Sequence, residues 1–191
     1  ANLGGCGNVL EGVRQGGEGG LLGLYHLNGT LGAIADLATI TATTGTSGTA
    51  SGAGMNYVAG KLNQGISFGG TSDYINIGNA GSVKTVEFWI NNSNAADGIL
   101  ELIDNTTYIS ITTPVATQVI TAMGFTDPTI YVNGVAGSTL AAGWNHVAVT
   151  TNTAVAAASV VLGEANNDYM AGSLDEVAIY NRVLDPIEIK A

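Results

Sequence analysis

The chain has 191 residues, of which 46% are hydrophobic and only 10% are charged. This length and apolar content fit one domain of ordinary size with a hydrophobic core, and they exclude a wholly disordered chain. The 15 acidic residues against 5 basic ones give a net charge of -10, which makes nucleic acids and anionic membranes poor partners and cations better ones.

The scarcity of charge leaves a surface of Thr, Ser, Asn and Gly, which favours an extracellular or cell-surface location. No apolar run approaches the ~20 residues of a membrane span, and no segment has the pattern of a signal peptide.

The first twenty residues differ in character from the rest. Residues 1–20 contain eight glycines and show neither helical nor strand periodicity, which predicts a flexible arm or linker before a domain at 21–191. Small apolar side chains in this arm could dock on a neighbouring subunit, namely Leu3, Val9 and Leu10. Cys6 is the only cysteine, so it is either an incidental thiol or a cross-link to another chain.

From Leu21 onward, short β-rich segments alternate with turn residues. LLGLYHL (21–27) is the first predicted strand, the pair Asn28-Gly29 follows as a turn, and residues 39–54 are expected to form a Thr/Ser/Gly/Ala loop. Further strands are expected, in chain order, at GISFGG, DYINIG, TVEFWIN, GILELID, TYISITT, TQVITAMG, PTIYVNGV, WNHVAVTT, ASVVLG and GSLDEVAIYN. Turns at intervals of about ten residues predict an all-β sandwich or barrel.

The end of the chain predicts a short helical turn. In D-P-I-E, Asp185 is expected as the N-cap, Pro186 at the first helical position, and Glu188 as the partner that completes a capping box.

Strand alternation assigns side chains to faces. In TVEFWIN, Val86, Phe88 and Ile90 share one face, and Glu87 and Trp89 share the other.

Trp144 and His146 share a face of another strand in the same way. Such aromatic rows either bind carbohydrate or form core and cross-strand pairs.

Asp175 is the acidic residue whose position raises the sharpest question. Strand alternation places it on the same side as Val177 and Ile179. If that side faces the core, the buried carboxylate needs a partner, either a cation or hydrogen-bond donors such as backbone N–H groups. The opposite facing would leave Asp175 in water.

Several spaced segments together resemble the laminin-G-like, concanavalin A-like jelly-roll domains of bacterial and viral surface proteins. These segments run from about Leu21 to Lys190: AGKLNQGISFGGTSDYINIGN, TVEFWIN, IYVNGV, GWNHVAVTT and GSLDEVAIYNRVLDPIEI. The resemblance implies two antiparallel sheets packed face to face, one of them concave, and a habit of binding sugars or proteins.

The resemblance also implies a structural calcium ion. In such folds the aspartate of the penultimate strand commonly reaches calcium beside the turn that follows the first strand. Carried over to this chain, the implied ligands are Asp175, Asn28 and Asp36. Calcium takes 6–8 oxygen ligands, many of them backbone carbonyls, so few carboxylates are needed.

Residues 164–176 form a second polar stretch. Asn166, Asn167 and Asp168 could make a sugar- or cation-binding loop beside Tyr169, whose ring can stack on a pyranose. Because Asn and Asp are common turn formers, the same residues could equally form a solvated hairpin turn.

Catalytic patterns are not found in the sequence. Laminarinase-type relatives carry two glutamates flanking an aspartate on one strand face, whereas the nearest acids here, Glu101 and Asp104, are three apart and face opposite ways. The sequence also lacks a nucleophile elbow and a phosphate-binding glycine loop. The domain is therefore predicted to be non-catalytic.

Two functional hypotheses remain. The first is a non-catalytic extracellular adhesion domain that binds a glycan or a surface protein. The second is a structural subunit of an extracellular filament, surface layer or virion, which self-associates through the N-terminal arm. An arm of about twenty residues could reach ~60 Å if extended, far enough to add a strand to a neighbour.

Overall fold

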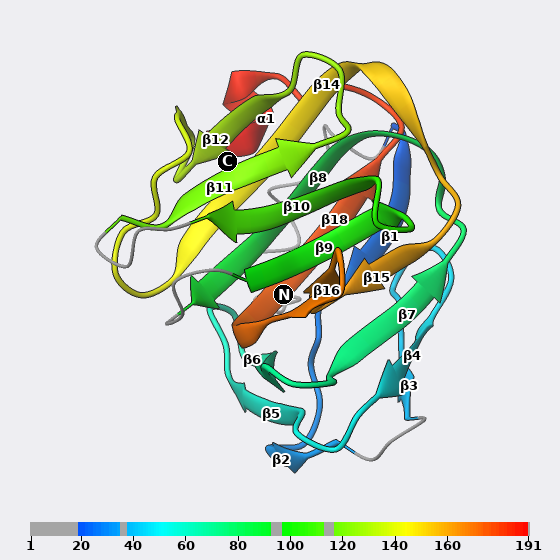
Figure 1. The fold of residues 1–191 in the computed structure, drawn as a ribbon, viewed down its shortest axis with the longest axis vertical. Coiled ribbons are helices and arrows are strands. Elements are labelled where there is room, and N and C mark those ends of the chain that lie inside the picture. The colour runs from blue at the N-terminus through cyan, green and yellow to red at the C-terminus, as the bar shows by residue number, and fades with distance from the viewer. Residues whose placement is uncertain (1–18, 35–37, 93–96, 113–116, 191) are drawn as a thin grey trace, which may run out of the picture.

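The computed structural model describes residues 19–34, 38–92, 97–112 and 117–190. Two large antiparallel β-sheets pack face to face as a sandwich, which confirms the predicted all-β fold class (Figure 1). Among the described residues, no helix is long and apolar enough to cross a membrane.

Sheet A has nine strands in the order β13-β12-β14-β8-β18-β6-β5-β2, and β1 also pairs with β18. Its strands are β1 (Leu21–Tyr25), β2 (Gly32–Ala33), β5 (Asn56–Ala59), β6 (Gln64–Gly69), β8 (Gly81–Asn92), β12 (Thr129–Val132), β13 (Val135–Ala136), β14 (Asn145–Ala157) and β18 (Ala171–Tyr180).

Sheet B has seven strands in the order β11-β10-β9-β15-β7-β4-β3. Its strands are β3 (Thr39–Ile40), β4 (Gly48–Ser51), β7 (Tyr74–Gly78), β9 (Asp97–Ile103), β10 (Thr107–Thr112), β11 (Val119–Met123) and β15 (Val160–Leu162). A small hairpin of β16 (Glu164–Ala165) and β17 (Asp168–Tyr169) forms a separate two-stranded sheet, and α1 (Pro186–Lys190) is the short helix near the C-terminus.

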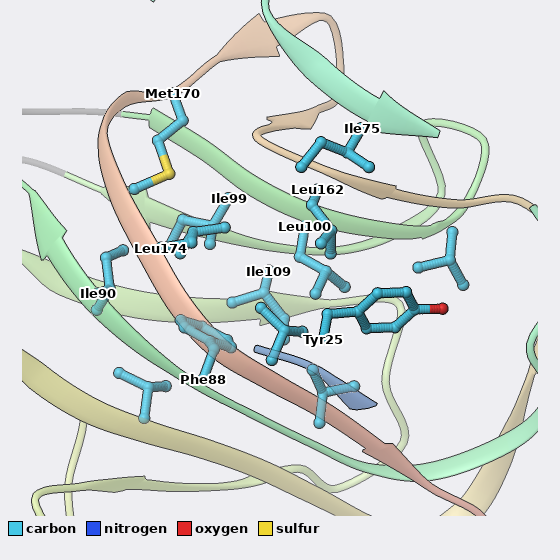
Figure 2. Close-up of a cluster of buried hydrophobic side chains, with 14 of the residues drawn as sticks. Tyr25, Ile75, Phe88, Ile90, Ile99, Leu100, Ile109, Leu162, Met170 and Leu174 are labelled. Carbon is cyan, nitrogen blue, oxygen red and sulfur yellow. The ribbon is translucent and has the colours of Figure 1, made fainter. Parts of the chain in front are cut away.

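The main core fills the space between the two sheets. Phe88 and Ile90 of β8 point into it, together with Leu100 of β9 and Tyr25 of β1 (Figure 2). Each fully buried large apolar side chain contributes ~1.5–3 kcal/mol to folding, so this layer supplies most of the driving force. The predicted division of β8 into a core face and an outer face is confirmed.

A second, smaller core lies on the outer face of sheet A. Leu184 and Ile189 from the C-terminal segment pack there on Ala148 of β14 and on Ala178 and Tyr180 of β18. Helix α1 therefore covers part of this face. Its start agrees with the prediction: the Asp185 Oδ1 atom accepts bonds from the N–H groups of the second and third helical residues. Glu188 returns a bond by accepting the Asp185 N–H, so the capping box is confirmed.

Two local predictions were wrong. Residues 39–54 are not wholly loop, because β3 and β4 lie within them and form the edge of sheet B. The pair Asn28-Gly29 does not close a hairpin, because β1 pairs with β18 and β2 pairs with β5. Gly29 is instead required for packing, since a Cβ atom there would overlap the ring of Tyr57.

The Asn-Gly pair between β12 and β13 does close a hairpin. Asn133 and Gly134 join β12 to β13 and both have positive φ, 51° and 75° respectively. This is the conformation that a two-residue turn of the Asn-Gly kind adopts.

Candidate ligand-binding sites

A cleft of about 280 Å³ opens beside α1, where β12 and β14 meet the segment that leads into the helix. Its lining is mixed: hydroxyls, one amide, two carboxylates, one aromatic ring and a few apolar side chains. The lining residues are Asp127, Thr129, Tyr131, Thr150, Thr151, Asn152, Val183, Leu184, Asp185 and Pro186.

Two buried threonines of β14 lie at the cleft. The Thr151 hydroxyl donates to the Thr126 carbonyl oxygen at 2.6 Å, and the Thr150 hydroxyl donates to that of Thr129 at 3.4 Å. The regular pairing of β14 with β8 is interrupted between Thr150 and Val155. Irregularities of this kind redirect side chains and recur beside functional sites. With their protons donated to the backbone, both hydroxyls can offer only lone pairs to a ligand.

The carboxylate of Asp185 is fixed by its capping role. Its Oδ1 atom accepts the N–H groups of Ile187 and Glu188 at 2.8 and 2.9 Å, and neither of these bonds uses Oδ2. Asp127 also lines the cleft and has a left-handed conformation with φ of 46°, which Asp tolerates better than most residues.

The cleft has an acidic lining without a cation. Within the described part of the chain, none of its lining residues is Lys, Arg or His. Arg182 is close in sequence, but its guanidinium binds both carboxylate oxygens of Glu188 at 2.7 Å. This pairing holds the pKa of Glu188 at about 2, well below its usual value. A ligand in the cleft therefore meets hydrogen-bond acceptors and negative charge.

Asp175 does not share a side with Val177 and Ile179, so the predicted facing was wrong. The pairing of β18 with β8 shifts between Asp175 and Ala178, and Glu176 has a φ of 50°. This bulge turns Asp175 to the outer face of sheet A, where it pairs with Trp89.

Asp175 is nevertheless completely buried, with 0% of its surface exposed. Its Oδ2 atom accepts the Leu62 N–H at 2.8 Å, so a loop backbone is one partner. Its Oδ1 atom is buried without a hydrogen-bond partner. Burial raises the pKa of this carboxyl to about 6. A Cβ atom on Gly60 would lie 2.6 Å from Oδ2, so the turn approaches this closely because residue 60 is glycine.

Of the three predicted calcium ligands, two contact the same turn and the third lies outside the described residues. Asp175 and Asn28 both hold the turn between β5 and β6, since the Asn28 Oδ1 atom accepts the Gln64 N–H at 3.0 Å. Asp36 lies outside the described residues. The unpartnered Oδ1 of Asp175 fits a cation ligand, whereas the Asn28 oxygen already holds the turn. Within the described ranges, no group of three or more His, Cys, Asp or Glu side chains is arranged to hold a metal ion.

The outer face of sheet A also carries both histidines of the chain, each next to a glutamate. The His26 Nδ1 atom lies 2.8 Å from both carboxylate oxygens of Glu176. The His146 Nε2 atom lies 3.5 Å from Glu87, which also accepts the Tyr180 hydroxyl at 3.0 Å.

Trp89 belongs to the same outer-face arrangement. Its ring lies 5.3 Å from that of His146, and the Lys61 ammonium lies 4.4 Å from the ring centre. Trp89 and His146 thus form a cross-strand pair, and Lys61 covers the Trp89 ring.

The predicted sugar loop is the turn of the β16–β17 hairpin. Asn166 and Asn167 both have positive φ, 56° and 61°, as a tight hairpin turn requires. The Asn166 N–H binds Glu101, and the Asn167 N–H binds Glu164. The ring of Tyr169 lies 6.4 Å from that of Tyr74. These contacts assign the two asparagines a structural role, and Asp168 is exposed beside them.

Glu101 is buried beneath this hairpin, with 4% of its surface exposed, and Asp104 lies in the exposed turn that follows β9. Burial raises the pKa of the neighbouring Glu164, and the charges of Glu101, Asp104 and Asp168 add to this effect.

The arm residues predicted to mediate assembly, Leu3, Cys6, Val9 and Leu10, lie outside the described residues.

The cleft was not anticipated from the sequence. Asp127, Tyr131, Asn152 and Asp185 come from separate segments that converge only through the pairing of β12 with β14 and the docking of α1. The available signal was local: Asp127 precedes a proline, and Asp185 caps a helix. Neither signal says that the two aspartates share a cleft.

Comparison with known proteins gives fold relatives only. No protein-family model matches the sequence, and no curated protein matches it. Domain 4 of AbnA, a GH43 extracellular arabinanase from Geobacillus stearothermophilus solved in complex with arabinotriose, has a TM-score of 0.58 and 19% identity. The match covers 90% of this chain and 97% of that one.

Trypanosoma rangeli sialidase has a TM-score of 0.55 and 14% identity, over 90% of this chain and 32% of the sialidase. The chain thus corresponds to about a third of the sialidase. At these identities the likeness shows a shared β-sandwich fold.

Proposed function

We propose that this chain is a non-catalytic, extracellular domain that binds glycan in the cleft beside α1. The observation that carries the proposal is the cleft's lining, in which hydroxyls, an amide and two carboxylates surround a tyrosine ring and apolar side chains. Sugars present hydroxyls and apolar C–H faces together, so a pocket that recognises them needs both kinds of group.

Two further observations support the proposal. The arabinanase domain that matches nearly the whole chain is known in complex with arabinotriose. A surface with few charges and a net charge of -10 suits a protein outside the cell.

The non-catalytic part of the proposal rests on the acidic side chains. Glu101 is buried under a hairpin, where it accepts the Asn166 N–H at 3.1 Å. Glu87 is buried between Tyr180 and His146. Neither glutamate is among the residues that line the cleft, so neither is placed to act on a sugar bound there.

The carboxylates that do line the cleft are Asp127 and Asp185, and Asp185 caps α1 by accepting two backbone N–H groups through Oδ1. A glycosidase needs two carboxyl groups that both act on the glycosidic bond, and a carboxylate committed to a helix cap is poorly suited to that role.

We also propose that a structural calcium ion binds Asp175 through its unpartnered Oδ1 atom. Bound calcium would neutralise the buried carboxylate and hold the turn between β5 and β6 against the bulge of β18. The glycan-binding proposal does not depend on this ion.

The direct test is affinity electrophoresis and titration calorimetry of the intact chain against soluble arabinan, xylan, β-glucan and galactan. We expect retarded migration in at least one polysaccharide, with no release of reducing ends. Asn152→Ala should weaken binding about two- to ten-fold, the range for one lost neutral hydrogen bond.

Asn91→Ala is the matched control, because Asn91 is also an exposed asparagine of sheet A but does not line the cleft. Equal loss in both variants would argue against the cleft. No binding to any glycan, together with filaments or lattices under the electron microscope, would favour the structural-subunit hypothesis instead.

A further inference from the structure

The described residues that line the cleft beside α1 carry acidic but no basic side chains. Asp127 and Asp185 supply carboxylates, and the described residues of the lining include no Lys, Arg or His. The two buried threonines have donated their hydroxyl protons to carbonyl oxygens at 2.6 and 3.4 Å. Hydrogen-bond acceptors therefore outnumber donors, and the fixed charge is negative.

The nearby arginine does not change this balance. Arg182 binds both carboxylate oxygens of Glu188 at 2.7 Å, and Glu188 in turn accepts the Asp185 N–H at 2.9 Å. To reach a ligand in the cleft, the guanidinium would have to break a bidentate pair that also supports the helix cap. Bidentate pairs of this kind are among the stronger side-chain hydrogen bonds.

We infer that the cleft selects non-anionic glycans and rejects those with carboxylate groups. This inference rests on the proposed glycan-binding function. Sugar hydroxyls donate well to carboxylates, so Asp127 and the Oδ2 atom of Asp185 are suited to neighbouring hydroxyls of a neutral ring. A uronic or sialic acid would instead bring a like charge to two carboxylates, and no basic side chain among the described lining residues offsets it.

The size of the cleft agrees with a sugar unit. Its volume of about 280 Å³ is close to the ~300 Å³ lower end of ligand pockets, which suits one ring better than an extended chain. Val183, Leu184 and Pro186 supply apolar contacts for the C–H face of that ring.

The test compares sugars that differ only by oxidation at C6. Cellotriose is paired with its C6-oxidised form and α-1,4-linked galactotriose with trigalacturonate, and arabinotriose serves as a further neutral probe, all titrated into the intact chain. We expect binding of at least one neutral probe, and at least ten-fold weaker binding of the acidic member of a pair.

Asp127→Asn locates the effect, because Asn keeps the size and tolerates the left-handed backbone at φ of 46°. It should weaken binding of the neutral probe about ten-fold or more, since hydrogen bonds to charged groups are the stronger ones. It should also reduce the ratio between the dissociation constants of the acidic and neutral probes. Asp168→Asn, on the β16–β17 hairpin, is the matched control. It should change neither the affinity for the neutral probe nor the ratio between the two probes.

The outcomes separate the two proposals. Tighter binding of the acidic probes would overturn the selectivity inference while leaving glycan binding in place. Loss of binding in Asp168→Asn but not in Asp127→Asn would move the site to the hairpin and overturn the assignment to the cleft. If no probe and no polysaccharide bound, the proposed function itself would fail.

Discussion

Asp175 combines complete burial with a carboxylate oxygen that has no hydrogen-bond partner. Burial disfavours the charged form of such a group, while the Leu62 N–H partly offsets the cost by donating to Oδ2 at 2.8 Å. The charge of Glu176 beside it adds to the penalty, and Glu176 is itself paired with His26. The result is a pKa raised from 3.8 to about 6.

This raised pKa predicts a stability that falls as the pH rises. The folded chain holds the Asp175 proton more tightly than the unfolded chain, so its contribution is fully present below about pH 4 and is lost as the pH passes 6. In the absence of metal, the free-energy difference between wild type and Asp175→Asn should therefore change by about 2–2.5 kcal/mol between pH 4 and pH 7. Denaturant unfolding of both proteins in a chelator measures it.

The sign of the change is the decisive feature. Asn can still accept the Leu62 N–H, so the unfolding free energy of the variant should lose this pH dependence while the turn contact remains. A difference that stays constant with pH would contradict the raised pKa. Added calcium should stabilise wild type above pH 6 and leave Asp175→Asn unchanged if the proposed ion binds there.

The β16–β17 hairpin shows how an element can contain polar residues for structural reasons. Its two turn residues, Asn166 and Asn167, both adopt the left-handed conformation. The Asn167 side chain also donates to the Asn105 side-chain oxygen at 3.1 Å. Gly98 of β9 contacts the hairpin backbone closely. A Cβ atom at residue 98 would overlap the backbone of Ala165 and Asp168, so this close approach requires glycine.

Substitution at residue 167 should therefore follow backbone preference. Asn167→Gly should be close to neutral, because Gly adopts positive φ without cost, whereas Asn167→Val should lose about 1–2 kcal/mol of unfolding free energy. Chemical denaturation of the two variants makes the comparison, and both lose the bond to Asn105. Equal stability of the Gly and Val variants would mean that the turn conformation contributes little.

Some elements could be predicted from local pattern, and others could not. The strict alternation of β8 and the D-P-I-E cap predicted a strand face and a helix start, since each depends on neighbours in sequence. The facing of Asp175 could not be predicted, because one bulge at Glu176 moves a residue to the opposite side of the sheet. The short strands β3 and β4 were missed because their Thr, Ser and Gly residues are also typical of loops.

At the scale of the whole molecule, the order of strands in each sheet differs from their order in the chain. β1 near the N-terminus pairs with β18 near the C-terminus, with Leu21 opposite Tyr180. The resemblance to jelly-roll domains supplied the two-sheet sandwich, whereas periodicity alone left sandwich and barrel open. The cleft was beyond both, because it depends on where α1 docks.

β18 has a central place in this arrangement. It pairs with β8 along one edge and with β6 and then β1 along the other. It also buries Leu174, Val177 and Ile179 completely in the main core. Helix α1, in contrast, adds one buried side chain, Ile189, to the smaller outer cluster. Loss of β18 would expose the edges of three strands, whereas loss of α1 would expose one patch.

Two truncations should therefore have very different effects. A chain ending at Leu184 loses α1 and the ~1.5–3 kcal/mol of Ile189 burial, yet should still unfold cooperatively at a lower denaturant midpoint. A chain ending at Met170 loses β18 and should show no cooperative transition by circular dichroism. The chain ending at Leu184 also lacks Asp185 and Pro186 of the cleft, so its glycan affinity should disappear while the sandwich remains. If this chain kept its affinity, the sugar would bind elsewhere.

Cooperative unfolding of the chain ending at Met170 would mean that the remaining strands of sheet A pair independently of their central strand.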